Sequence, residues 1–413
     1  MIKIKIPNNN IEERKYIIKI IFKEFFELDY TLLYDAKHYE IVFKNQKKLI
    51  IEDTFFNKYP KNLEYLHLKN IPMNIENLDI FAQIFFMLTR WEEYVNKNRD
   101  THNRFPATES LAYKQKFLDK PIVDEKLEVL KNKFLTLDPT LKFKSKKDNL
   151  ILTHDIDNPY FWNNSKQLIK IVAGDLLKRH SFNLAINRIK EYYLVKKNKI
   201  KDPFDTFDWL MDQSECIGIK SRFYFMSGGI TKFDNTYNIN NPKILELIQK
   251  IKHRGHIIGI HPSYDAYANI IQFSKEKKLL EAVIGKEVTE GREHYLRFEV
   301  PTTWQIWEDN NMTIDSTCGY ADREGYRCGT GNEFSVFNIL TRQQLKLKER
   351  PLVFMDSRDF NCNGHYSRSQ FDHHLFEYLQ NPHSSITILF HNDIFKRDPY
   401  YIKEYQKVLH VWN

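Results

Sequence analysis

The sequence predicts an α/β protein in two parts, a small α/β domain over residues 1–147 and a larger α/β domain over residues 148–413. Three observations lead to this prediction. The chain has 413 residues, which is more than one ordinary hydrophobic core serves. From residue 148 onward, seven β-like runs alternate with helical stretches, as in a parallel sheet or barrel. The polar run 142–148 would serve as the linker between the two parts.

The first part begins with short apolar runs. Residues 40–43 and 49–51 predict strands because they are short, apolar and rich in β-branched residues. A helix is predicted near residues 80–95, where Ile80, Ile84 and Trp91 belong to an apolar stripe at helical spacing. That stripe indicates core packing. Residues 104–121 are punctuated by proline and predict irregular structure.

The second part contains the seven β-like runs. The predicted strands are Leu150–Thr153, Arg222–Met226, Ile257–Ile260, Tyr295–Val300, Thr313–Asp315, Leu352–Met355 and Ile386–Phe390. One helix between them is well marked, because Pro242 suits a first helical turn and Gly255 suits the position just past a helix end.

Composition narrows the class of protein. Hydrophobic residues make up 42% and aromatic residues 14% of the chain, as in packed domains. The formal net charge of +8 is modest and the lysines are spread along the whole chain, so we expect no nucleic-acid partner. No apolar run is long enough to span a membrane, and the first 15 residues lack a signal-peptide pattern, so we expect a cytoplasmic protein.

The four cysteines suggest reduced thiols. Cys216, Cys318, Cys328 and Cys362 form no CxxC pair, so neither a zinc finger nor a thioredoxin-type motif is supported. The sequence also lacks a GxSxG elbow, a GxxxxGK[ST] phosphate loop and a GxGxxG dinucleotide motif.

Two carboxylates follow the first strand of the second part. Asp155 and Asp157 alternate along the chain, so both side chains can point to one side of the strand's carboxyl end. Nearby carboxylates repel each other unless a cation or a shared proton relieves them. One solution is a metal ion bound by one Asp while the other stays available as a base. An ordinary turn after a strand is the alternative, since Asp favours turns.

Other polar residues also follow predicted strands, as the sites of barrel enzymes do. His261, Asp356 and His391 each come directly after one. If Pro262 starts a helix, Asp265 shares a face with His261, and with Asp157 they would make a three-ligand metal site. An exposed helix carboxylate is the alternative for Asp265.

Two further segments carry candidate residues. His391 can serve as a general acid because its ordinary pKa lies near neutrality, and Asp393 could orient it. A buried structural histidine is the alternative. In residues 291–298, an arginine could keep Asp155 ionised, and His294 is a possible substitute ligand.

Three motifs in order across residues 149–393 resemble the NodB-type polysaccharide deacetylases, a carbohydrate-esterase-like family. They are THDID at Thr153–Asp157, GHIIGIH at Gly255–His261 and LFH at Leu389–His391. The segments RWEEY at Arg90–Tyr94 and RFPATESLAYK at Arg104–Lys114 resemble the small domain that precedes the barrel in one branch of these proteins. The resemblance implies a distorted (β/α)7 barrel preceded by a small α/β domain.

The resemblance also assigns roles. Asp155 matches the family's catalytic base, Asp157 its metal carboxylate, His261 its first metal histidine and His391 its general acid. Where the family has a second histidine, this chain has Asp265, and the family's Arg-x-Pro motif is stretched here.

Several assignments stay open after these matches. Arg297 is our first choice for the arginine that orients the base, and Arg292 is the second. Asp265 or His294 would be the third ligand of a divalent metal, with zinc expected.

The implied activity is removal of an N-acetyl group from a sugar or glycan intermediate, and surface-polysaccharide synthesis is the expected setting. The substrate could be nucleotide- or lipid-linked. Two alternatives stay open: a non-catalytic glycan-binding descendant of the fold, and a metal amidase that acts on a non-sugar amide. The sequence leaves the oligomeric state and the role of the first domain undetermined.

Overall fold

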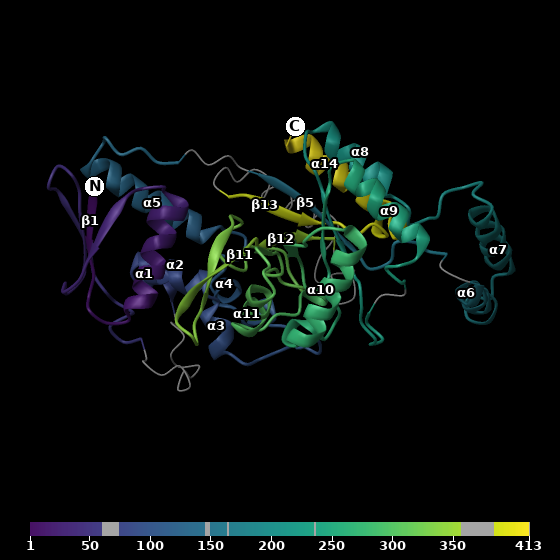
Figure 1. Ribbon diagram of the computed structural model, residues 1–413, viewed down its shortest axis with the longest axis horizontal. Helices are drawn as coiled ribbons and strands as arrows, with labels where there is room; N and C mark the ends of the chain where they lie inside the picture. The colour runs from purple at the N-terminus through teal and green to yellow at the C-terminus, as the bar shows by residue number, and fades with distance from the viewer. Residues whose placement is uncertain (60–73, 145–148, 163–164, 235–236, 357–383, 413) are drawn as a thin grey trace. The chain divides into compact units, whose positions relative to one another are not determined.

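The computed structural model describes residues 1–59, 74–144, 149–162, 165–234, 237–356 and 384–412 (Figure 1). The α-helices of these residues are α1 (Ile11–Lys19), α2 (Ile80–Leu88), α3 (Trp91–Val95), α4 (Leu111–Lys114), α5 (Ile122–Leu137), α6 (Ser165–Leu177), α7 (Phe182–Lys196), α8 (Phe207–Cys216), α9 (Pro242–His253), α10 (Ile270–Ile284), α11 (Thr302–Asp309), α13 (Ile394–Arg397) and α14 (Tyr400–Trp412). None of the described helices combines the length and the apolar character that crossing a bilayer requires.

The described strands form two sheets. The smaller sheet has the order β2-β1-β3-β4, and the larger has the order β10-β11-β9-β8-β7-β6-β5-β13-β12. The strands are β1 (Ile2–Lys5), β2 (Tyr30–Leu33), β3 (Tyr39–Val42), β4 (Lys48–Ile51), β5 (Leu150–Ile156), β6 (Arg222–Phe225), β7 (Ile257–Ile260), β8 (Glu290–Gly291), β9 (Ile314–Asp315), β10 (Phe334–Asn338), β11 (Gln343–Glu349), β12 (Leu352–Met355) and β13 (Ile386–Leu389). The fold is therefore mixed α/β, with a curled nine-stranded half-barrel sheet that is consistent with a distorted barrel.

The smaller sheet lies within residues 2–51. Strand β1 pairs parallel to β2 and antiparallel to β3, and β3 pairs antiparallel to β4. Strands β3 and β4 confirm the two strands predicted for residues 40–43 and 49–51. In β3 the side chains alternate in burial, with Tyr39 and Ile41 inside, which is the period-2 pattern of a sheet with one covered face.

The helix predicted over residues 80–95 is divided in two. Asp79 caps α2 by accepting hydrogen bonds from the backbone N–H groups of Phe81 and Ala82. Helix α2 then ends at Leu88, because Arg90 adopts a left-handed backbone with φ of 51° before α3 begins. In the predicted apolar stripe Ile84 and Trp91 are buried, as expected for core, and Ile80 at the start of α2 is half-buried.

Strands β5, β6 and β7 are parallel neighbours, as the alternation of strands and helices predicted. Every residue of β5 is buried. Helix α9 begins at Pro242, and its buried residues Ile244, Leu247, Ile248 and Ile251 share one face. Asn241 caps this helix through the backbone N–H of Lys243. The helix and strand predictions for this region are confirmed.

Other local predictions were wrong. The strand predicted for residues 295–300 is absent, and residues 294–296 form a 3-10 turn in which Tyr295 and Leu296 have positive φ. Residues 261–265 are also not helical. The larger sheet has nine strands instead of seven, in part because the sequence reading missed the antiparallel pair β10 and β11. Residues 145–148 of the predicted linker and Cys362 lie outside the described residues.

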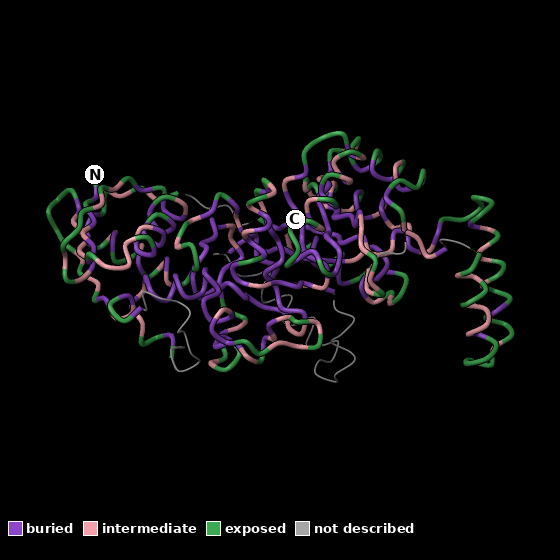
Figure 2. Tube along the Cα trace, turned by 60° about the horizontal axis from the view of Figure 1, so that its bottom comes forward, coloured by how far each residue is buried: buried purple, intermediate pink, exposed green. Residues whose placement is uncertain are grey.

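Contacts divide the chain into two compact units. The first comprises residues 1–151, 264–275 and 289–388, and the second comprises residues 152–263, 276–288 and 389–413. Both units contain buried segments, which are coloured purple in Figure 2. The boundary predicted at residue 147 stays a prediction.

Candidate metal centre

The end of β5 presents two carboxylates on one side of the strand. Asp155 is the sixth residue of β5 and is 2% exposed, and Asp157 follows the strand directly. His154 directly precedes Asp155 and therefore faces the opposite side of the strand. There its Nδ1 lies 2.7 Å from the carbonyl oxygen of Phe390, and its ring contacts Tyr405 of α14. Burial lowers the pKa of His154 to about 4, so this histidine is neutral and structural.

His261 lies between the two carboxylates. It follows β7, and its backbone N–H extends the pairing with β6 by donating to the carbonyl of Phe225 over 2.9 Å. Its Nε2 lies 3.3 Å from Oδ1 of Asp157, and its Nδ1 lies 3.9 Å from Oδ2 of Asp155. The ring is 2% exposed. One buried imidazole therefore has a carboxylate near each nitrogen.

His391 approaches Asp157 from β13. Its Nε2 lies 3.8 Å from Oδ2 of Asp157. The backbone around it is fixed on both sides, because Phe390 donates its N–H to Thr153 and the buried side chain of Asn392 donates to the carbonyl of Asn158. The sequence suggested Asp393 as the group that orients His391.

Asp393 also holds the neighbouring chain in place, and its role in orienting His391 stays a prediction. Its Oδ2 accepts hydrogen bonds from Asn158 and from Nε of Arg397, the latter over 2.9 Å. These bonds fix Asp393 at the start of α13. They also tie the turn after β5 to the chain that follows β13.

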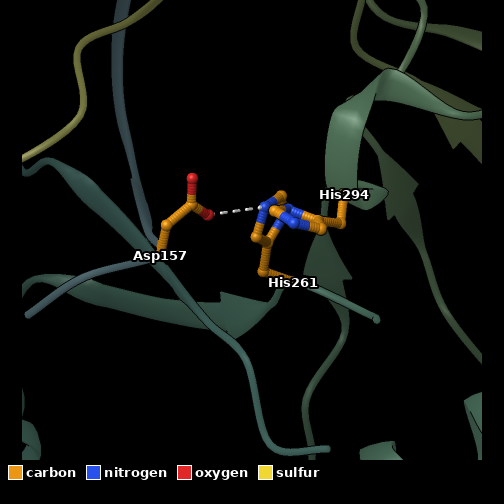
Figure 3. A group of neighbouring side chains, drawn as sticks. All are labelled: Asp157, His261 and His294. Atoms are coloured by element: carbon orange, nitrogen blue, oxygen red, sulfur yellow. Dashed lines mark ion pairs between the residues drawn. The ribbon is translucent and has the colours of Figure 1, made fainter. Parts of the chain in front are cut away.

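A cluster of possible metal ligands contains Asp157, His261 and His294. One ligand atom from each residue lies within 4.8 Å of the others, and the three side chains point toward one another in Figure 3. One carboxylate and two imidazoles are an ordinary donor set for a catalytic zinc ion, which keeps a position open for water. The residues present therefore fit a divalent metal.

His294 is 4% exposed and its backbone is held by its neighbours. The preceding residue, Glu293, donates its N–H to Oγ1 of Thr317 and accepts a hydrogen bond from Nε1 of Trp307 over 2.8 Å. The following residue, Tyr295, has a positive φ and packs edge-on against the imidazole. A turn, and not a strand, therefore presents His294.

The structure places Asp265 and Arg297 against each other. The side chain of Asp265 is 63% exposed, and its Oδ1 accepts from Nη1 of Arg297 over 2.9 Å. The Arg297 guanidinium also donates to the carbonyls of His102 and Tyr264 and lies about 4 Å from the ring centroids of Tyr264 and Tyr267. Arg292, the second candidate, is fully buried and donates to the carbonyl and hydroxyl of Ser316.

Tyr237 is a site-lining residue that the sequence reading missed. Its hydroxyl donates to the carbonyl of Ile156, between Asp155 and Asp157, and accepts the N–H of Met226 at the end of β6. Tyr237 also lines a cavity of about 740 Å³ in the second unit. An isolated tyrosine in a loop gives no periodic signal from which this contact could have been predicted.

The basic side chains of that cavity include Lys199 and Lys243, neither of which forms an ion pair with a described carboxylate. Asp202 also lines the cavity, but its carboxylate accepts hydrogen bonds from the backbone N–H groups of Phe161 and Trp162. Asp205 and Glu246 line the cavity as well, so its five lysines exceed its three carboxylates and give it a positive surface that suits an anionic group.

Comparison with known proteins gives one family match and several similar structures. A family of unknown function, DUF7033, matches residues 2–139. No curated protein matches the chain. A candidate polysaccharide deacetylase from Mycobacterium smegmatis is similar in structure, with 12% identity, a TM-score of 0.40 and coverage of 65% of this chain and 84% of that one.

Two further structures are similar at the same level. A PuuE allantoinase has 12% identity and a TM-score of 0.40, with coverage of 63% of this chain and 83% of its own. A CE4 family pseudoenzyme from Bacillus anthracis has 9% identity and a TM-score of 0.32, with coverage of 64% and 62%. We therefore base the functional proposal on the residues of the site.

Proposed function

We propose that this protein is a metal-dependent hydrolase that removes an N-acetyl group from a sugar or glycan intermediate, most simply one used in surface-polysaccharide synthesis. The observation that carries the proposal is the position of Asp157, whose two oxygens face the Nε2 atoms of His261 and His391. A second carboxylate, Asp155, is buried beside the same His261 ring. In an ordinary turn after a strand such carboxylates would be exposed to water, whereas Asp155 is buried.

The metal would be held by Asp157, His261 and His294, with zinc as the expected ion. We prefer His294 to Asp265 as the third ligand. Asp265 is largely exposed and is engaged by Arg297, whereas His294 is buried. A neutral imidazole in this place also avoids the extra negative charge that a second ligating carboxylate would bring.

Each remaining residue then has a distinct task. A divalent ion at this site supplies a Lewis acid and makes a water molecule more acidic. Asp155 accepts a proton from the attacking water, and the C–N bond of the amide breaks as His391 donates a proton to the departing amine. The products are acetate and a free amino sugar. Arg297 and Arg292 both stay candidates for orienting Asp155, because both are buried and both also have other partners.

The sugar assignment rests on the three sequence motifs, and the lysine-lined cavity supports an anionic substrate. Tyr237 joins the wall of this cavity to the backbone between the two aspartates. A phosphate of a nucleotide- or lipid-linked sugar could therefore lie in the cavity while its N-acetyl group reaches Asp155. The cytoplasmic location stays a prediction.

The proposal is tested by screening N-acetylated sugar conjugates for released acetate with purified protein, with and without a chelator. We expect release from at least one conjugate, loss of release after chelation and recovery when zinc is added back. Release only from non-sugar amides would support the amidase alternative. Tight glycan binding with no acetate release from metal-loaded protein would support the non-catalytic alternative and contradict our proposal.

The third ligand can be identified by metal analysis of two variants. His294→Ala should weaken zinc affinity by about a hundredfold or more, because losing a direct ligand should cost at least as much as losing a residue that only supports one. Asp265→Ala should leave zinc affinity unchanged, because the side chain is exposed and paired with Arg297. The reverse result, with zinc lost from Asp265→Ala and kept by His294→Ala, would restore the ligand set first expected from the sequence.

A further inference from the structure

Helices α6 and α7 form a hairpin that packs on itself (Figure 1). The residue at its centre is Asp175, which is 1% exposed and forms ion pairs with Arg179 and Arg188. Ser181 begins α7 by accepting a hydrogen bond from the N–H of Leu184. The inner polar groups of the hairpin are thus partnered within the hairpin, and its outer faces are free to serve another purpose.

The outer face of α7 carries an exposed apolar stripe. Phe182 is 70% exposed, Ile186 49%, Ile189 38% and Tyr193 57%. These residues occupy positions i, i+4, i+7 and i+11, which lie on one face of a helix. Residues 165–196 hold eight of the twenty large hydrophobic side chains that are exposed in the described part of the chain. Much of Figure 2 is purple, whereas this hairpin at the right is mostly green and pink.

The hairpin and the five residues that follow it together carry the net charge of the whole chain. Residues 165–201 contain ten lysines and arginines and two carboxylates, a net charge of +8, and the net charge of all 413 residues is also +8. The residues outside this stretch together carry no net charge. Lys190 and Lys197 lie four residues after Ile186 and Tyr193, so they flank the stripe. Neither lysine forms an ion pair with a described carboxylate.

We propose that the α6–α7 hairpin attaches this protein to an anionic membrane surface. An interfacial helix buries an apolar face at the level of the lipid headgroups while lysines beside that face contact anionic lipid, and α7 has both features. Such a helix lies on the bilayer, in keeping with the lack of a described helix that could span it. A second copy of the hairpin is disfavoured as the partner because it would bring the same positive charge, and a nucleic acid would leave the apolar stripe unused.

The test is sedimentation of the full chain with vesicles of phosphatidylcholine, with and without phosphatidylglycerol. We expect binding only to the anionic vesicles, and weaker binding as salt is raised. Lys190→Glu/Lys197→Glu should weaken partitioning on the order of tenfold or more, because each basic residue near the surface contributes about 1 kcal/mol. Lys275→Glu/Lys278→Glu on α10 changes the charge equally at exposed positions outside the hairpin, so it should bind like wild type.

The contribution of the apolar stripe of α7 to vesicle binding is tested with a second pair of variants. Phe182→Ser/Ile186→Ser should weaken binding to anionic vesicles, whereas Ile230→Ser, at a fully exposed position outside the hairpin, should not. Acetate release from a water-soluble substrate should be the same in all of these variants. Vesicle binding is measured without any substrate, so the membrane proposal can be tested even if the proposed hydrolase activity is wrong.

Three outcomes would overturn the proposal. The first is wild-type protein that does not bind anionic vesicles. The second is hairpin variants that bind as well as their controls. The third is weak vesicle binding by every variant together with evidence for another partner. That evidence would be a dimer that the stripe variant dissociates, or binding to duplex DNA that the stripe variant retains.

Discussion

Replacing Asp155 by asparagine should abolish amide hydrolysis while leaving the zinc content close to that of wild type. Asparagine keeps the shape of the side chain but cannot accept the proton of the attacking water. General-base catalysis contributes about a hundred- to ten-thousandfold in rate, so kcat should fall by that amount. Turnover of the best substrate from the acetate screen, measured with metal analysis of the same preparation, checks both parts.

The position of Asp155 also defines the competing explanation. Its Oδ2 lies 3.9 Å from Nδ1 of His261, whose Nε2 faces Asp157. A carboxylate in that place could act through the histidine, as the carboxylate partners of metal-bound histidines do. If Asp155→Asn loses zinc in proportion to activity, and excess zinc restores turnover, Asp155 is a positioning residue and our assignment of the base is wrong.

Asp157→Asn is the matched control for this experiment. It makes the same chemical change two residues away, at the carboxylate whose two oxygens lie near Nε2 of His261 and Nε2 of His391, so it should lose zinc and activity together. Two variants with the same chemistry should therefore divide into one that retains metal and one that does not. A common phenotype would show that the two carboxylates do not have separate roles.

The residues at strand ends could be predicted from the sequence because strands have simple rules. Side chains alternate along β5, so Asp155 and Asp157 had to share a side, and parallel neighbours end at the same edge of a sheet. His261 and His391 followed from the same reasoning. The structure brings both histidines within 4 Å of an Asp157 oxygen.

The rest of the site depends on contacts that no local pattern encodes. The segment from Tyr295 to Val300 reads as a strand, yet two left-handed residues turn it, and Arg297 is enclosed by Tyr264 and Tyr267. Those tyrosines lie about thirty residues earlier in the chain, so the stacking could not be predicted from spacing. The charge of the α6–α7 hairpin was hidden for a different reason, because composition averaged over 413 residues conceals a local excess.

Replacing Glu93 by glutamine should strongly destabilise the first unit. Glu93 is 1% exposed and binds two arginines, with its Oε1 accepting from Nε of Arg90 over 2.8 Å and its Oε2 accepting from Nη2 of Arg327 over 2.6 Å. Removing the carboxylate charge leaves two buried guanidinium groups without their counter-ion. Breaking a buried ion pair in this way costs about 3–5 kcal/mol, which denaturant unfolding at neutral pH would measure.

Glu92→Gln is the matched control. Glu92 is adjacent to Glu93 and equally buried, but its pKa is shifted in the opposite direction. Burial raises the pKa of Glu92 to about 7 despite the nearby Arg90. Burial would also raise the pKa of Glu93, but Arg327 and Arg90 lower it to about 2. Glutamine resembles protonated Glu92, so at a pH near the ordinary glutamate pKa, where folded Glu92 is protonated, this variant should change the free energy of unfolding by about 1 kcal/mol or less.

The contributions of the two glutamates to the free energy of unfolding should also change with pH in opposite directions. The pKa of Glu93 is lower in the folded chain than in the unfolded one, so its contribution is present above the ordinary glutamate pKa and is lost as pH falls toward 2. The deficit of Glu93→Gln should therefore shrink over that range. Glu92 has a raised pKa and is most favourable when protonated, so wild type should lose its contribution as pH rises toward 7, while Glu92→Gln should not. Equal deficits in both variants at every pH would mean that lost packing, and not the charge on Glu93, determines the stability of this network.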